Sequence, residues 1–180
     1  MKRRSVLSLT VVLLMTMFGV TPVARAEDPK EAQALLEALG KSKHTLLEGV
    51  REAAKGGAMP ISAKFELEDG KLSLSVYTAG KGLSVAPEQN VLQELSGSPE
   101  QGRWEPKVEV FKDVPHVARS SEQLTLMALG KSSLADTIAR VQKTQAGTVF
   151  SVTPVIRNHK PVAEVLVADK GKVTKLMQPL

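Results

Sequence analysis

A repeated pentapeptide constrains the fold of this chain more than any other feature. Residues 38–42 and residues 128–132 both read Ala-Leu-Gly-Lys-Ser. The same pattern follows each copy: an amphipathic helix, an alternating strand, a turn and a second alternating strand. Self-similarity at a fixed period indicates that one structural unit occurs more than once. The sequence therefore predicts a small α+β unit made twice, about 90 residues apart.

Each copy precedes a segment with the period of a helix. Three apolar residues in each half are spaced by four and then three positions, which places them on one helix face. They are Leu46, Val50 and Ala53 in the first half, and Leu134, Ile138 and Val141 in the second. We expect Ser132 or Ser133 to cap the second helix, with Asp136 in its first turn. Glycines at 56–57 and at 147 are expected to end the two helices.

Alternation of apolar and polar residues then predicts two paired strands in each half. The apolar positions are Ile61, Ala63, Phe65, Leu67, Leu72, Leu74 and Val76 in the first half, and Phe150, Val152, Pro154, Ile156, Ala163, Val165 and Val167 in the second. Asp69-Gly70 is a favoured two-residue hairpin turn, and Asn158-His159 stands at the same place 89 residues later. This shift preserves the inward face throughout, whereas a one-residue slip would turn the face over.

The two halves diverge beyond these strands. A third strand is predicted at residues 172–176 of the second half, and its weaker counterpart is expected near residues 83–85. Residues 120–129 are expected to repeat a short helix at residues 32–39.

Residues 87–115 are extra material in the first half. A short helix is expected at residues 91–95, a Gly/Ser/Pro-rich loop at 96–102 and a strand at 107–111. Pro115 is our predicted boundary between the halves.

The N-terminus has the three parts of a secretory signal peptide. Lys2, Arg3 and Arg4 are positive, residues 6–20 are almost entirely apolar, and residues 24–26 read Ala-Arg-Ala, a small-x-small cleavage site. The apolar run is shorter than the ~20 residues that span a bilayer, and the chain has no cysteine for a lipid anchor. The sequence therefore predicts a periplasmic or secreted protein with no membrane span after cleavage.

Removal of residues 1–26 also changes the charge balance. The chain has 24 Lys+Arg and 19 Asp+Glu, and four of the basic residues, but no acidic residue, lie in the signal peptide. The mature chain of 180 − 26 = 154 residues then has 20 basic and 19 acidic residues, a net charge of +1. A nucleic-acid partner has no electrostatic support in this balance. Because each half lies near the size at which one core is marginal, we expect the halves to pack on each other or on a partner.

The second half contains the motifs that suggest a family. Residues 133–138 read Ser-Leu-Ala-Asp-Thr-Ile, a hairpin runs through residues 162–168, and residues 169–173 read Asp-Lys-Gly-Lys-Val. The first half matches in Leu-Leu-Glu-Gly-Val at residues 46–50 but lacks the Asp of the last turn at residues 79–82. These motifs resemble the PepSY family, whose domains commonly have Leu-x-x-Ala-Ile near the helix start and an Asp-x-x-x-Gly-like turn before a last strand that ends in Val.

The resemblance implies an α+β fold of two repeated units. Each unit would be one helix packed on a three- to four-stranded antiparallel sheet, of the PepSY or cystatin-like kind. The expected divisions are a signal peptide at residues 1–26, a first unit with an extra C-terminal segment at 27–114, and a second unit at 115–180.

The resemblance also implies a non-catalytic extracytoplasmic module. Family members occur as inhibitors or folding aids in propeptides of secreted metallopeptidases, so the expected partner is an envelope protein or peptide, such as a peptidase or a sensor ectodomain. Strand addition to an open sheet edge is the expected mode of recognition. A structural or assembly protein of the cell envelope and an enzyme with dispersed residues are the alternatives. The sequence leaves the oligomeric state open.

The sequence assembles no evident catalytic site. The two Gly-Lys-Ser copies lack the earlier glycine of a P-loop, because Leu35 and Thr125 stand there. His44, Glu48 and Glu52 share a helix face that could hold a metal, but a solvated polar face is the favoured interpretation. We therefore expect no catalytic, cofactor-binding or metal-binding residues and no cofactor.

Two other kinds of residue remain to be placed. The three histidines at 44, 116 and 159 are all expected to be exposed. Trp104, the only tryptophan, is expected either to cover one end of the first sheet or to be an exposed anchor for a partner.

Overall fold

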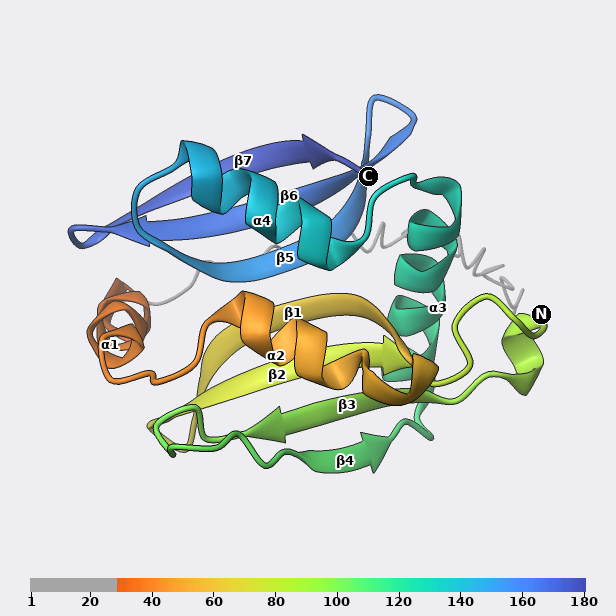
Figure 1. Ribbon diagram of the computed structural model, residues 1–180, viewed down its shortest axis with the longest axis horizontal. Coiled ribbons are helices and arrows are strands. Elements are labelled where there is room, and N and C mark those ends of the chain that lie inside the picture. Colours follow the sequence, from red (N-terminus) through yellow and green to blue (C-terminus); the bar gives the residue numbers. More distant parts are fainter. Residues whose placement is uncertain (1–28) are drawn as a thin grey trace, which may run out of the picture.

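The computed structural model describes residues 29–180 (Figure 1), so the predicted signal peptide lies outside the described residues. The helices are α1 (Pro29–Leu39), α2 (Leu46–Ala53), α3 (Val114–Leu129) and α4 (Leu134–Thr144), with short 3₁₀ turns η1 (Lys55–Gly57) and η2 (Pro87–Gln89). The strands are β1 (Met59–Glu68), β2 (Lys71–Ala79), β3 (Leu92–Gly97), β4 (Lys107–Val110), β5 (Thr148–Arg157), β6 (Lys160–Asp169) and β7 (Lys172–Pro179). Within this part of the chain, no helix is both long and apolar enough to cross a membrane.

All seven of these strands belong to one antiparallel sheet, in the order β4-β3-β2-β1-β5-β6-β7. The expectation of two repeated units, each with its own helix-covered sheet, is therefore wrong, although the broad α+β class holds. The two halves meet where β1 pairs with β5. A separate first unit would leave β1 as an exposed edge, and a separate second unit would do the same with β5. Joining them removes both edges and merges two marginal cores.

The repeat is nevertheless visible in the backbone. The register of the first hairpin shifts between Pro60 and Ser62, and that of the second shifts between Val149 and Ser151. Each shift is a β-bulge, which inserts one extra residue and bends the strand. The two bulges are 89 residues apart, the same shift that aligns the alternating strands in the sequence.

Helices α2 and α4 cover one face of the sheet and contact each other, as Figure 1 shows. The apolar stripes predicted for both helices are buried there: Leu46, Val50, Ala53, Leu134, Ile138 and Val141. The core they form with the sheet is one cluster that contains residues of both halves. Ser133 caps α4 as predicted, with Asp136 in the first turn.

Helices α1 and α3 lie at opposite ends of the strands (Figure 1). Helix α3 contacts β1, β2, β3, β5 and β6, so it crosses the junction between the halves. Helix α1 packs on β1 and β2 and also borders β5 and β6. The short helices predicted before the two amphipathic helices are thus present, and both touch the two halves.

The strands predicted from alternation are confirmed, and so are the third strand of the second half and the strand at residues 107–111. Two predictions for the first half are wrong. Residues 83–85 form no strand, and residues 91–95, predicted to be helical, belong mostly to β3. The partner of Ala79 is Leu92, with 12 residues between them, whereas Ala168 and Val173 have four between them. The connection to the third strand is therefore eight residues longer in the first half than in the second (12 − 4).

Candidate functional site

The face of the sheet opposite α2 and α4 is polar at its centre. From Ser62 onward, the even-numbered residues of β1 point to this face and pair across the hairpin with odd-numbered residues of β2. The pairs are Ser62–Tyr77, Lys64–Ser75, Glu66–Ser73 and Glu68–Lys71. We call these eight residues, with Glu94 of β3 opposite Tyr77, the polar face. It arises directly from the apolar-in, polar-out alternation of the two strands.

Lys64 lies at the centre of the polar face. Its Nζ forms an ion pair with Glu66 and lies 5.7 Å from the centroid of the Tyr77 ring. It also lines two cavities, one of about 490 Å³ beside α1 and one of about 180 Å³ under α3. The first has apolar walls that include Phe65 and Phe150, and the second is lined by polar residues such as Arg119.

Tyr77 is half-buried against α3. Burial raises the pKa of its phenol, and the nearby carboxylates of Glu94 and Glu66 raise it further. The hydroxyl therefore stays protonated at neutral pH and can donate a hydrogen bond, but it is a poor base. The Tyr77 ring stacks on Phe111, with centroids 5.8 Å apart, and Phe111 stacks on His116 at 5.0 Å.

The start of α3 is fixed by its own cap. The side chain of Asp113 accepts a hydrogen bond from the His116 backbone N–H at 3.1 Å and contacts His116 Nδ1 at 2.7 Å. These hydrogen bonds lower the pKa of Asp113. His116 thus contacts both the Asp113 cap and the Phe111 ring.

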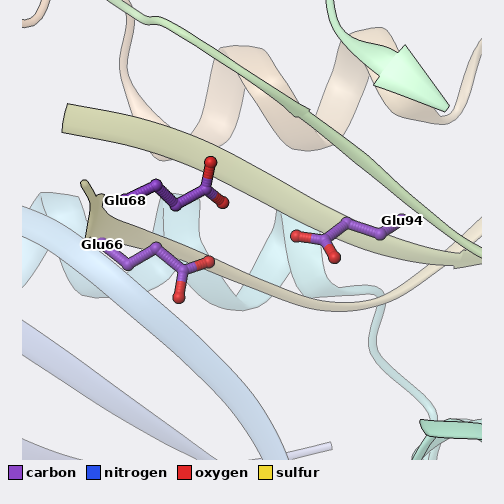
Figure 2. Close-up of side chains that lie close together, drawn as sticks. All are labelled: Glu66, Glu68 and Glu94. Atoms are coloured by element: carbon purple, nitrogen blue, oxygen red, sulfur yellow. The ribbon is translucent and has the colours of Figure 1, made fainter. Parts of the chain in front are cut away.

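Three carboxylates converge at the other end of the polar face. One oxygen each of Glu66, Glu68 and Glu94 lies within 4.8 Å of the other two, and Figure 2 shows the side chains turned toward a common space. Burial raises the pKa of Glu68, and the charges of Glu66 and Glu94 raise it further. The Ser73 hydroxyl acts in the opposite direction, because it lies near enough to favour the charged form of Glu68.

The sheet has two outer strands, and they differ in length. β4 has four residues, whereas β7 has eight. On β7, Val173 and Met177 are exposed and lie on the same side of the sheet as the polar face, beside β6. Residues 170–180 contain Lys170, Lys172 and Lys175 and no acidic residue.

The three residues of the helix face that could hold a metal, His44, Glu48 and Glu52, do not form a common site in the structure. Thr45 N–H and Oγ1 both donate to Glu48 Oε2, at 2.7 and 3.0 Å, and Glu52 pairs with Lys55 at 2.6 Å. His44 is half-buried, with Nε2 3.0 Å from the Gln101 carbonyl oxygen. His116 and His159 are exposed as predicted.

Trp104 belongs to the core, which settles the two alternatives for it. Its side chain is 6% exposed, and Nε1 donates to the Gly97 carbonyl oxygen at 3.3 Å. The Gly-Lys-Ser copies lie in turns between helices, since Gly130 caps α3 and Lys41 N–H donates to the Ala38 carbonyl oxygen at 2.9 Å.

Sequence reasoning missed the carboxylate cluster. Alternation of β1 places Glu66 and Glu68 on one face, and that part of the signal was available. The composition of residues 91–95 predicts a helix, and a helical Glu94 has no place beside Tyr77 on the sheet.

No protein-family model, curated protein or solved structure matches this chain. The PepSY resemblance therefore stays a prediction from the motifs.

Proposed function

We propose that this protein is a non-catalytic periplasmic module that binds an extended segment of an envelope protein or peptide by strand addition at β7. The observation that carries the proposal is the eight-residue outer edge of the sheet. An outer strand presents unpaired backbone N–H and C=O groups that a further strand can satisfy. The periplasmic location rests on the predicted signal peptide.

The chemistry of the edge favours an acidic segment. Lys170 and Lys172 have no ion-pair partner among the described residues, whereas Lys175 pairs with Glu164 at 3.1 Å. Lysines on an edge strand discourage pairing between identical copies, but they attract carboxylates. Val173 and Met177 offer apolar contact to alternate side chains of the added strand.

A binding role also suits the groups of the polar face. Lys64 is held by Glu66, and Tyr77 stays protonated, so both supply fixed hydrogen-bond donors rather than a nucleophile or a base. A peptidase or a sensor ectodomain is the partner class that the PepSY resemblance implies, and modulation of such a partner is the proposed outcome.

The alternative is a structural or assembly protein of the envelope. It is favoured by one observation: β1 and β5, which occupy equivalent places in the two halves, already pair edge to edge within the chain. In a scaffold, the same edge-to-edge pairing would occur between copies of the chain, with β7 of one copy against β7 of another.

Site-specific photo-crosslinking in intact cells tests both functions. A photo-crosslinking amino acid replaces Val173 on β7 or, as the matched control, Val108 on β4; these valines are 49% and 58% exposed on the two outer strands. The proposal expects one heterologous product from position 173 and none from 108, with an acidic segment at the crosslink. A product between two copies of the chain would favour the scaffold. Absence of any product at 173 would contradict strand addition.

A further inference from the structure

The carboxylate cluster of the polar face carries an inference that does not depend on the proposed function. It lies on β1 and β3, in the first half, whereas β7 is the far edge of the second. Three carboxylates whose oxygens approach within 4.8 Å repel one another unless a cation lies between them. Lys64 pairs with Glu66 alone. Among the described residues, no ion pair includes Glu68 or Glu94, although Lys71 faces Glu68 across the hairpin.

A second feature points to a ligand at the same place. Ser73 stands directly opposite Glu66 on the polar face and is 4% exposed. Its Oγ is buried and has no hydrogen-bond partner, although it lies close to the Glu68 carboxylate. Buried hydroxyls without partners are costly and call for an explanation.

We propose that Glu66, Glu68 and Glu94 bind a divalent cation, with the Ser73 hydroxyl as a further oxygen donor below it. All the donors are oxygens, which are the ligands of hard cations such as Ca²⁺ and Mg²⁺. They come from three strands of one sheet, and Glu68 is exposed to solvent, which supplies water as further oxygen ligands.

Calcium fits this arrangement better than magnesium. Ca²⁺ accepts an irregular set of oxygen ligands, whereas Mg²⁺ requires near-octahedral geometry and gives up its water reluctantly. A site with three carboxylates and bound water is expected to be weak, with a Kd on the order of 10⁻⁴–10⁻³ M. The Lys64 ammonium competes with the cation for Glu66, which lowers the affinity further.

Isothermal titration calorimetry of the chelator-treated protein with CaCl₂ and with MgCl₂ tests the site. Glu68→Gln and Glu94→Gln should each weaken calcium binding at least about tenfold, since even outer-shell changes cost roughly 10–100-fold. Glu122→Gln is the matched control, because it removes one exposed carboxylate from α3, away from the cluster. It should leave the affinity unchanged.

Two further readouts separate loss of binding from loss of folding. In chelator, the Gln variants should melt no lower than the parent, because they relieve repulsion between like charges. Lys64→Gln should bind calcium more tightly, a gain that misfolding cannot produce. The proposal is overturned if the parent binds no calcium at millimolar concentration, if both Gln variants bind it as the parent does, or if Glu122→Gln loses as much affinity as they do.

Discussion

Ala63 of β1 pairs with Val152 of β5, and these residues hold the same position in the two halves, 89 residues apart (152 − 63). The halves therefore meet as the subunits of a two-fold dimer do, through the same strand used twice. The pseudo-symmetry axis passes through this residue pair. The bulges at equivalent places of β1 and β5 agree with that relation.

Shared packing predicts that the two halves unfold together. The core is one cluster that includes Val50 and Ile138 from the helices of opposite halves, and α2 contacts α4. In urea, the fluorescence of Trp104 and the far-UV circular dichroism should change in one coincident transition. Trp104 reports the first half, whereas circular dichroism reports both. Two separated transitions would show that each half folds by itself.

Gly49 lets α2 approach the sheet closely. A Cβ on Gly49 would lie 2.6 Å from Leu74 Cδ2, and Leu74 is fully buried, so a shift of its side chain would disturb the packed core around it. Gly49→Ala should therefore lower the free energy of unfolding by about 1 kcal/mol, because an overpacking cost of roughly 1–3 kcal/mol exceeds the gain in helix propensity of about 1 kcal/mol.

Gly40→Ala is the control for that substitution. A Cβ there would meet only the Glu37 carbonyl oxygen, at 3.5 Å. Urea unfolding should give a change within about 0.5 kcal/mol. Equal losses for the two variants would contradict the close approach of α2.

The capping box of α2 predicts a dependence of stability on pH. Hydrogen bonding to the Thr45 backbone lowers the pKa of Glu48, against a smaller opposing effect of burial. A carboxyl with a depressed folded-state pKa stabilises the fold above its unfolded pKa of about 4.3, and that contribution is lost as the pH falls through the folded value.

Glu48→Gln isolates this contribution, because Gln keeps the capping geometry but does not titrate. The parent should lose stability more steeply than the variant below about pH 4.3 in urea melts at stepped pH. Parallel curves would contradict the prediction. Thr45→Ala, which removes the cap itself, should cost about 1 kcal/mol at neutral pH.

The turn of the second hairpin contains a residue in a strained conformation. His159 has φ +60°, whereas Gly70 takes the equivalent place of the first hairpin with φ +74°. His159→Gly should stabilise the protein by about 0.5–1 kcal/mol, because relief of left-handed strain exceeds the added entropy of the unfolded chain.

Gly70→Ala provides the opposite test. No atom lies within 4 Å of the added Cβ, so only backbone strain opposes the change. It should destabilise by about 1 kcal/mol in thermal melts. The idea of turn strain fails if the two substitutions shift the melting temperature in the same direction.

The extra material of the first half shows where sequence reasoning stopped. Residues 91–95 are rich in Leu, Gln and Glu, which favour helices. They form most of β3 because the free edge of β2 offers a row of backbone partners, and tertiary context overrides propensity. Because of this error, the sequence did not predict where Glu94 lies. Alternation along β1 predicted that Glu66 and Glu68 share a face, but the position of the third carboxylate depends on the pairing of β3 with β2.

The sequence by itself determined the local structure of the repeat. Apolar periodicity predicted the helices α2 and α4 and the inward faces of β1, β2, β5 and β6, and the turn residues predicted both hairpins. These features are predictable because they depend on residues that are neighbours along the chain. The tertiary structure alone decided that β1 and β5 join the halves into one sheet and that Glu94 lies beside Glu66 and Glu68. Backbone N–H and C=O groups at a strand edge are the same in every residue, so the sequence does not encode which edges meet.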